Sequence, residues 1–233
     1  MGLGAIRTRT VDTATYRSDV ATELLQQRRR DAAGEPAGAL VLLHGRGADE
    51  NDLYPLLEEL DPERRLLGVT TGAPLTNVPP GGRHWYLVPR VGYPDPATFA
   101  ASYALLTSFA DGLLAERGIG WDRVAIGGFS MGTVMSYALA LGPERPAPAA
   151  LVAFSGFVPT VEGWEPDFSG REALQAFIHH GVNDPVISVE FARHARELLT
   201  GAGLEAEYLE TDAGHWIPPE AIAPARALVD SVG

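Results

Sequence analysis

The sequence has 233 residues, 45% of them hydrophobic, and a formal net charge of −12 from 18 Lys and Arg against 30 Asp and Glu. Such an acidic chain is poorly suited to nucleic acids or anionic membranes as partners. It contains no cysteine, which excludes a disulfide framework, a thiolate nucleophile and a cysteine-ligated metal. We find no apolar run long enough to span a membrane and no signal peptide. We therefore expect a cytoplasmic protein without membrane insertion.

The length and apolar content fit a single α/β domain over residues 1–233. Residues 1–35 give the weakest pattern. Within them, Ile6 to Thr15 is rich in Thr and Val, which favours an edge strand or hairpin. Arg28 to Arg30 are expected to form a solvated end before a turn.

From residue 39 onward, short apolar runs alternate with helical patterns. The apolar runs predict buried parallel strands at 39–43, 66–70, 124–126, 149–154, 176–178 and 205–209. The helical patterns predict helices that contain residues 53–60, 99–113, 131–141, 191–198 and 222–229. Asp52, Asp95 and Ser188 are the expected N-caps of three of them. Alternating strands and helices indicate a mostly parallel, doubly wound sheet with helices on both faces.

Polar motifs follow four of the predicted strands directly. They occupy residues 44–49, 128–132, 180–185 and 211–216. Ligands of doubly wound folds bind at the carboxyl ends of the strands. We therefore expect these four segments to meet at one site.

The segment Gly128-Phe129-Ser130-Met131-Gly132 has the form G-x-S-x-G and lies between an apolar strand and a helical pattern. This context is typical of a nucleophile elbow. The turn is too tight for a Cβ two positions before or after the serine, so glycine occupies both positions. We expect Ser130 to have a strained backbone that presents its Oγ at the N-terminus of the following helix.

A serine nucleophile needs a histidine base, and the base needs an acid that orients it. The expected chain order for this elbow is Ser, then Asp or Glu, then His. Ser130, Asp184 and His215 satisfy this order and are the predicted catalytic residues. Asp212 is an alternative acid, although it lies only three residues before His215 on the same loop.

The remaining histidines do not form a metal-binding pattern. His179 and His180 are neighbours at a strand end and point to opposite faces, so they cannot chelate one metal together. His44 precedes a glycine-rich loop and is expected to be structural. No His-Glu-x-x-His or similar spacing occurs, and we expect neither a metal nor a cofactor.

Four segments together resemble the phospholipase/carboxylesterase family of α/β-hydrolases, which includes the acyl-protein thioesterases: Leu43 to Gly47, Gly127 to Gly132, His180 to Pro185, and Gly214-His215. The resemblance runs from about residue 39 to the C-terminus. It implies the α/β-hydrolase fold and the same three catalytic residues. It also implies an oxyanion hole formed by the backbone N–H groups of Arg46 and Met131. Arg83 to Tyr86 looks like the family's R-x-W-[FY] element beside the pocket.

Two long irregular segments, 71–96 and 156–170, are expected to supply the walls of a substrate pocket. The candidate contacts are large apolar side chains, one of them next to the histidine base: Trp85, Tyr86, Phe157, Trp164 and Trp216. The thioesterase branch of the family typically has an apolar residue where this chain has Arg46. A charge there favours short or medium acyl chains, or esters with an anionic group, unless Asp49 or Glu50 pairs with it.

These residues predict a serine carboxylesterase that hydrolyses small to medium carboxylic esters or thioesters through an acyl-enzyme intermediate. An acyl-protein thioesterase or lysophospholipase is the alternative, and a cofactor-free haloperoxidase side activity needs the same triad. A non-catalytic binding module would be expected to lack a member of the triad. The expected partner is a small-molecule ester or thioester, and apolar loops favour a homodimer.

Overall fold

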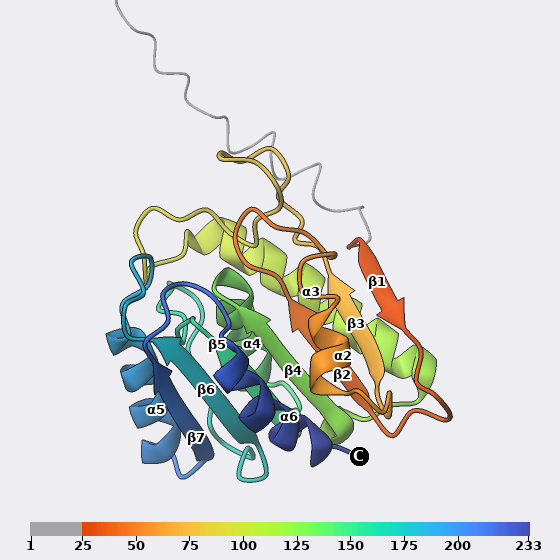
Figure 1. The fold of residues 1–233 in the computed structure, drawn as a ribbon. Helices are drawn as coiled ribbons and strands as arrows, with labels where there is room; N and C mark the ends of the chain where they lie inside the picture. Colours follow the sequence, from red (N-terminus) through yellow and green to blue (C-terminus); the bar gives the residue numbers. More distant parts are fainter. Residues whose placement is uncertain (1–24) are drawn as a thin grey trace, which may run out of the picture.

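The structure of the protein, a computed structural model, describes residues 25–233. These residues form a seven-stranded sheet in the order β1-β3-β2-β4-β5-β6-β7 (Figure 1). Only β1 is antiparallel to its neighbour, and all other pairs are parallel. The strands are β1 (Gln27–Arg30), β2 (Ala39–Leu43), β3 (Leu67–Thr71), β4 (Val124–Phe129), β5 (Ala150–Phe154), β6 (Gln175–Gly181) and β7 (Glu205–Thr211). The mostly parallel α/β architecture predicted from the sequence is confirmed.

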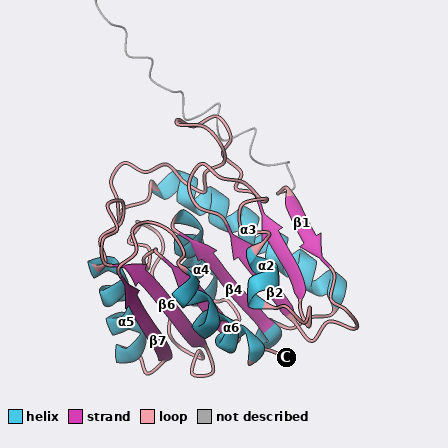
Figure 2. Cartoon of the chain, viewed as in Figure 1, coloured by secondary structure: helices cyan, strands magenta, loops and turns pink. Residues whose placement is uncertain are grey.

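Helices cover both faces of this sheet (Figure 2). They are α2 (Leu56–Leu60), α3 (Pro96–Arg117), α4 (Met131–Leu141), α5 (Glu190–Gly201) and α6 (Ile222–Asp230), with 3-10 turns η1 (Trp121–Arg123) and η2 (Pro219–Ala221). One hydrophobic cluster contains side chains of α3, α4 and α5, and a second contains those of α2 and α6. Alternate residues of β2 point into the two clusters, Val41 into the first and Leu42 into the second. The central strands are therefore almost continuously apolar, because neither face meets water.

Helix α3 begins where the sequence predicts, directly after Asp95. The carboxylate of Asp95 accepts a hydrogen bond from the N–H of Thr98 at 2.9 Å, and Pro96 takes the first helical position. Gly118 ends the helix with φ 62°. Among the described residues, α3 is long and apolar enough by length and composition to cross a membrane, whereas the sequence analysis expects no such run. Within the fold, its side chains such as Phe99 and Leu106 are buried in the cluster shared with α4.

Arg28 to Arg30 do not form the solvated end expected from the sequence. They lie in β1, and Arg30 is buried with only 7% of its surface exposed. Its guanidinium donates to the carbonyl oxygen of Leu57 at 2.6 Å and pairs with the buried carboxylate of Asp61. Burial of this arginine is possible because a hydrogen-bonded opposite charge accompanies it. The strand or hairpin expected at Ile6 to Thr15 lies outside the described residues.

The expected cap at Asp52 is also wrong. Helix α2 begins at Leu56, with Pro55 at the N-cap position. The preceding residues form turns instead, held by a hydrogen bond of 2.8 Å from the N–H of Asn51 to the Asp49 carboxylate. Asp52 is thereby left free to line the cavity described below.

The predicted cap at Ser188 is displaced by one residue. Helix α5 has Val189 at its N-cap position, one residue beyond the serine. The Oγ of Ser188 accepts only a long hydrogen bond of 3.4 Å from the N–H of Glu190. The serine therefore contributes to the start of the helix without occupying the N-cap itself.

Candidate active site

The predicted nucleophile elbow connects β4 to α4 through Ser130. This residue has φ 54° and ψ −116°, a strained conformation of the kind expected at a tight strand-to-helix turn. A Cβ on Gly132 would lie 1.9 Å from the carbonyl oxygen of Leu43, and one on Gly128 would lie 2.6 Å from the carbonyl carbon of Gly132. Both positions require glycine, because any side chain would collide with the neighbouring backbone.

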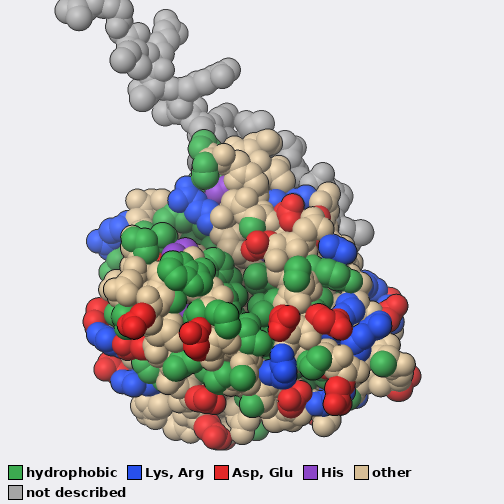
Figure 3. All heavy atoms as spheres, viewed as in Figure 1, with side chains coloured by type: hydrophobic (Ala, Val, Ile, Leu, Met, Phe, Trp, Pro, Cys, Tyr) green, Lys and Arg blue, Asp and Glu red, His purple; other side chains and the backbone are tan. Residues whose placement is uncertain are grey.

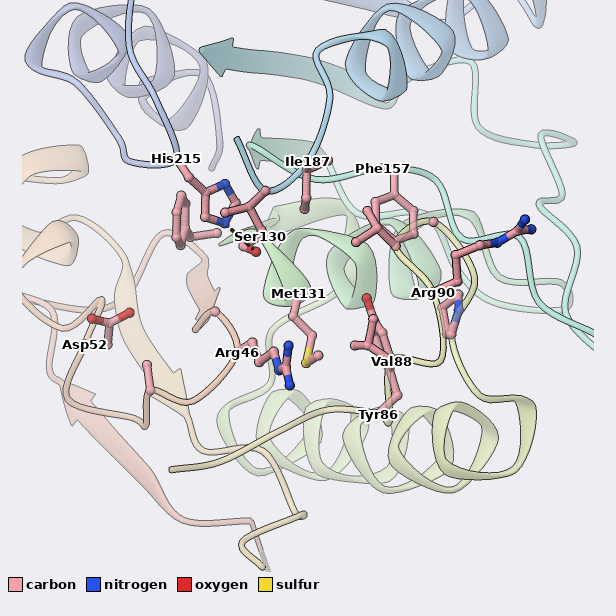
Figure 4. Close-up of a pocket in the computed structure, with 17 residues that line it drawn as sticks. Arg46, Asp52, Tyr86, Val88, Arg90, Ser130, Met131, Phe157, Ile187 and His215 are labelled. Carbon is pink, nitrogen blue, oxygen red and sulfur yellow. Dashed lines mark hydrogen bonds between the residues drawn. The ribbon is translucent and has the colours of Figure 1, made fainter. Parts of the chain in front are cut away.

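The three predicted catalytic side chains form one hydrogen-bonded chain at the carboxyl ends of the strands. Ser130 follows β4, Asp184 follows β6, and His215 follows β7. The Nε2 of His215 lies 2.9 Å from Ser130 Oγ, and its Nδ1 lies 2.6 Å from Asp184 Oδ2 (Figure 4). A carboxylate can only accept, so Nδ1 carries the proton and Nε2 is free to accept from the serine. This is the arrangement that serine activation requires.

The carboxylate of Asp184 is enclosed and firmly held. Its Oδ1 accepts hydrogen bonds from the N–H groups of Val186 and Ile187 at 2.8 and 2.9 Å. Burial acts to raise the pKa of this carboxyl, but hydrogen bonds from Ile187, His215 and Val186 outweigh it and hold the pKa below its usual value. Among the described residues, the carboxylate of the alternative acid, Asp212, accepts no hydrogen bond from His215, whose Nδ1 donates to Asp184 instead.

His180 lies beside the proposed acid, a position for which the sequence analysis gave it no role. Its Nε2 lies 2.8 Å from the carbonyl oxygen of Ile187 and 3.3 Å from Asp184 Oδ2. Since a carbonyl oxygen only accepts, Nε2 carries a proton, and burial lowers the pKa of His180, which favours the neutral form of the ring. The adjacent His179 instead contacts the hydroxyl of Thr211 at 2.9 Å. In a sequence, this contact could be recognised by a histidine four residues before the proposed acid, at the end of the strand that precedes it.

The loop after β2 is fixed by His44, in the structural role expected for it. Its Nδ1 donates to the carbonyl oxygen of Gly45 at 2.6 Å, and its Nε2 accepts from the N–H of Ala73 at 2.9 Å. Burial lowers the pKa of His44 to about 4, so the ring stays neutral near pH 7. The indole N–H of Trp85 donates to the carbonyl oxygen of His44 at 3.0 Å. These contacts fix the backbone conformation of the residues that directly precede Arg46.

The backbone N–H groups of Arg46 and Met131 are available as hydrogen-bond donors. Met131 is the first residue of α4, and such a residue has no carbonyl partner within its own helix. Among the described backbone contacts outside regular elements, none uses the N–H of either residue. Both residues line the same cavity as Ser130. Two free N–H groups beside the nucleophile fit the oxyanion hole that the family resemblance implies.

A cavity of about 410 Å³ opens beside Ser130 (Figure 4). Its walls are mostly apolar and are formed by Tyr86, Val88, Phe129, Phe157, Val186 and Ile187. Of the five aromatic side chains expected to line the pocket, Tyr86 and Phe157 do so. A cavity of this size and character can enclose an acyl or aryl group of modest length.

The other three expected wall residues do not line the cavity. Trp85 is completely buried behind the loop, where it donates to His44. Trp164 is buried in the core and packs edge-on against Phe99. Trp216 stands at the surface with 57% of its area exposed. A large aromatic residue in a long loop can fill the core, the pocket or the surface, and composition does not separate these cases.

Sequence reasoning also missed the aliphatic walls at Val88, Val186 and Ile187. Nothing in their residue type distinguishes them from core positions. A usable signal exists for the last two, which lie two and three residues after Asp184. An aspartate often accepts hydrogen bonds from N–H groups at this spacing, which folds the loop back beside the catalytic acid.

Comparison with protein families assigns this chain to a known family. Residues 30–230 match the family model described as phospholipase/carboxylesterase. The chain belongs to the phospholipase/carboxylesterase family. Its family is one of ester hydrolases, and the predicted α/β-hydrolase fold is confirmed by solved structures with the same architecture.

Several relatives match nearly the whole chain. Acyl-protein thioesterase 1 of Debaryomyces hansenii is 26% identical over 231 residues, covering 91% of this chain and 98% of the relative. The putative hydrolase MhqD of Bacillus subtilis is 28% identical, covering 83% of this chain and 92% of the relative. The crystal structure of esterase PE8 has a TM-score of 0.75 at 25% identity and covers 90% of this chain and 99% of that one. The Bacillus cereus carboxylesterase structure has a TM-score of 0.76 at 22% identity, with 94% and 99% covered.

This family member carries charged groups at the rim of its cavity. Arg46, Arg90 and Asp52 all line it. Arg46 is exposed and donates to the carbonyl oxygen of Pro79 at 3.3 Å. The sequence analysis left open an ion pair of Arg46 with Asp49 or Glu50. Neither residue forms this ion pair, and Glu50 pairs with Arg83 instead, at 3.6 Å.

Over residues 25–233, no group of three or more His, Cys, Asp and Glu side chains is arranged to hold a metal ion.

Proposed function

We propose that this carboxylesterase-family protein is a serine esterase that acts through an acyl-enzyme formed on Ser130, with His215 as the base and Asp184 as the acid that orients it. The observation that carries this proposal is the continuous hydrogen-bonded chain from Ser130 Oγ through His215 to Asp184 Oδ2, at 2.9 and 2.6 Å. Two groups alone would not suffice, because the base works only with its proton held on Nδ1.

In the first half of the reaction, Ser130 Oγ attacks the ester carbonyl carbon while its proton moves to His215 Nε2. The carbonyl oxygen gains a negative charge and accepts hydrogen bonds from the N–H groups of Arg46 and Met131. Asp184 stabilises the imidazolium that forms. When the tetrahedral intermediate collapses, the carbon–oxygen bond to the alcohol breaks and His215 returns the proton to the departing group. An acyl group then remains on the serine.

In the second half, a water molecule takes the place of the alcohol. His215 removes a proton from the water, whose oxygen attacks the acyl carbon. Collapse of the second intermediate breaks the bond to Ser130 Oγ, and the histidine returns the proton to the serine. The products are a carboxylic acid and an alcohol or thiol, with the enzyme unchanged. Every proton transfer uses the single nitrogen Nε2, so neither a metal nor a cofactor is needed.

The preferred substrates are small to medium-sized carboxylic esters or thioesters. The cavity of about 410 Å³ is lined by apolar side chains such as Tyr86 and Phe157, but Arg46 stands at its rim. Each methylene of a growing chain gains about 0.8 kcal/mol while it displaces water from apolar surface. That gain stops where the chain would desolvate the guanidinium.

An acyl-protein thioesterase or lysophospholipase activity is the second candidate. It is favoured by the similarity to acyl-protein thioesterase 1 of Debaryomyces hansenii, which extends over 98% of that protein. Such substrates carry long alkyl chains, so a comparison of esters of graded length separates the two candidates. A non-catalytic binding module is not favoured, because Ser130, His215 and Asp184 are all present and hydrogen-bonded to one another. The cytoplasmic location and the homodimer stay predictions.

A fluorophosphonate probe tests the proposed nucleophile. We expect covalent addition to Ser130, located by mass spectrometry of the digested protein, together with loss of p-nitrophenyl ester hydrolysis. Ser130→Ala should keep the fold, as judged by circular dichroism, and abolish both labelling and activity. Ser136 provides the matched control, because its Oγ is buried and bonded to the carbonyl oxygen of Gly132 at 2.9 Å. Labelling of a serine other than Ser130, or an active alanine variant, would overturn the assignment.

A further inference from the structure

The cavity beside Ser130 has a feature that ester hydrolysis alone does not require, namely an arginine without an ion-pair partner. Within the described part of the chain, Arg46 takes part in none of the salt bridges. Its one hydrogen bond, to the carbonyl oxygen of Pro79 at 3.3 Å, uses one of the five N–H donors of a guanidinium. The other donors face solvent and the cavity.

The two acidic residues considered in the sequence analysis as partners of Arg46, Asp49 and Glu50, are committed elsewhere. The carboxylate of Asp49 accepts hydrogen bonds from the backbone and side-chain nitrogens of Asn51 at 2.8 and 3.1 Å. Glu50 lies 3.6 Å from Arg83. In a chain with a net charge of −12, an arginine left without a carboxylate at a cavity rim is free to bind an anion from solution.

The positions of the charged side chains indicate where such an anion would bind. In the view of Figure 4, the guanidinium of Arg46 lies between Asp52 and Tyr86, and all three residues line the cavity. The guanidinium of Arg90 extends away from Ser130 and is placed over the ring of Tyr93, 3.5 Å from its centroid. Asp52 lies at the opposite side from Tyr86 and would repel an anion there. Arg46 is therefore the group that an anionic substrate would meet.

We propose that the preferred substrate is an ester with a carboxylate a few bonds from its ester carbonyl, such as a half ester of a short dicarboxylic acid, and that the Arg46 guanidinium binds this carboxylate. The inference rests on the proposed function, since it places the ester carbonyl at Ser130 Oγ. The backbone N–H of Arg46 contacts the carbonyl oxygen while its own side chain holds the carboxylate, so one residue fixes both ends of the substrate. The planar guanidinium matches a carboxylate with two parallel hydrogen bonds.

Figure 3 shows hydrophobic side chains next to basic ones near the upper end of this face, with acidic side chains also present there. Among the exposed large hydrophobic residues, Val91 and Val186 line the cavity. The cavity therefore offers apolar contacts to the body of a substrate, while Arg46 offers hydrogen bonds to a charged group.

The test compares two esters of the same length that differ in charge. Monoethyl glutarate carries the carboxylate, and ethyl 4-carbamoylbutanoate carries a neutral amide in its place. Acid release is followed by chromatography, and the readout is the ratio of kcat/KM for the anionic ester to kcat/KM for the neutral one. We expect this ratio to be about ten or more in the wild type and to fall about tenfold to a hundredfold in Arg46→Gln, as expected for a lost hydrogen bond to a charged group. The ratio cancels any effect of the substitution on the oxyanion loop.

Two further variants separate direct contact from general charge. Arg46→Lys should restore part of the ratio, because an ammonium group keeps the charge but not the paired hydrogen bonds. Arg196→Gln removes the same charge from an exposed position on α5, where the guanidinium lies over Tyr208, and should leave both activities unchanged. The difference should appear mainly in KM, since the carboxylate is bound equally before and during the reaction.

A wild-type ratio near one, or an equal ratio in the wild type and Arg46→Gln, would overturn this inference. A fall in the ratio of the same size in Arg196→Gln would also overturn it, by showing that only net charge matters. If neither ester is hydrolysed and Ser130 is not labelled by the fluorophosphonate, the proposed esterase function itself fails. Labelling of Ser130 with hydrolysis of neutral esters alone refutes only the substrate class.

Discussion

Asp184→Asn tests whether Asp184 orients His215, with a change that leaves the shape of the side chain almost unaltered. In the wild type, Oδ1 accepts the N–H groups of Val186 and Ile187 at 2.8 and 2.9 Å, and Oδ2 accepts from His215 at 2.6 Å. In the variant, the amide oxygen must take the Oδ1 position, because only an acceptor can serve two N–H donors. The amide NH₂ then faces His215, which must move its proton to Nε2. That nitrogen can no longer accept the proton of Ser130.

The magnitude follows from the loss of the correct tautomer. In the general template of the serine triad, this substitution lowers kcat about 10⁴-fold, which corresponds to an increase of about 5 kcal/mol in the activation free energy. Hydrogen bonds that outweigh burial hold the pKa of Asp184 below its usual value, so the carboxylate that fixes the tautomer of His215 is ionised at neutral pH and is protonated only at acidic pH. A loss of kcat in Asp184→Asn at neutral pH therefore reports the removal of this charged acceptor.

The assay is the pH dependence of p-nitrophenyl butyrate hydrolysis by the wild type, Asp184→Asn and Asp212→Asn. The last variant is the matched control, because Asp212 lies on the loop of His215 and uses its carbonyl oxygen, rather than its carboxylate, to accept from Asn183. Urea unfolding should show that both variants remain folded at the assay temperature. A loss of kcat below tenfold in Asp184→Asn, or a larger loss in Asp212→Asn, would refute the assignment of the acid.

Three further results are expected. For p-nitrophenyl esters, kcat/KM should peak at acyl chains of about two to eight carbons and fall for longer chains. Arg46→Leu should extend the range of accepted chain lengths. An identical chain-length profile in the variant would show that Arg46 does not limit the length of the acyl chain. Prolonged treatment with EDTA should leave esterase activity unchanged, because each step of the proposed mechanism uses side chains and backbone of this chain; a loss reversed by a divalent ion would contradict it. Asp61→Leu should lower the free energy of unfolding by about 3–5 kcal/mol, because it removes the buried carboxylate that pairs with Arg30 and leaves only the exposed carboxylate of Glu58, 3.5 Å away. The double variant Arg30→Met with Asp61→Leu should recover part of that loss in urea denaturation, and an equally unstable double variant would argue against uncompensated charge as the cause.

The predicted triad residues come together in the structure because their placement depends on backbone geometry, which leaves clear traces in a sequence. Gly128 and Gly132 mark the elbow, since a Cβ at either position would collide with backbone. The loops that hold Asp184 and His215 directly follow apolar strands, and parallel strands bring their carboxyl ends to one edge. The N-cap of α3 at Asp95 could be predicted for a similar reason, because a capping residue is recognised from the residues next to it in the sequence.

Predictions failed where a residue's environment depends on distant parts of the chain. Arg28 to Arg30 look like a solvated basic segment, yet β1 pairs with β3 and buries Arg30 against Asp61 from another loop. Trp85 and Tyr86 are adjacent and chemically similar, but only Tyr86 lines the cavity. The indole N–H of Trp85 instead donates a hydrogen bond to the carbonyl oxygen of His44, which keeps the side chain buried. A side chain's choice between core and pocket is thus decided by partners that composition does not reveal.

Residue 46 shows how catalysis and substrate choice can be separated within one position. The proposed oxyanion donor is a backbone N–H, which every residue except proline supplies. The buried ring of His44 holds this loop through its hydrogen bonds to Gly45 and Ala73, and the Arg46 side chain adds one long hydrogen bond to the carbonyl oxygen of Pro79 at 3.3 Å. The side chain at 46 can therefore be apolar or charged without loss of the N–H, and it changes only what the cavity rim accepts. We therefore expect an arginine there to select for substrate charge, while the hydrogen-bonded chain from Ser130 to Asp184 remains the same.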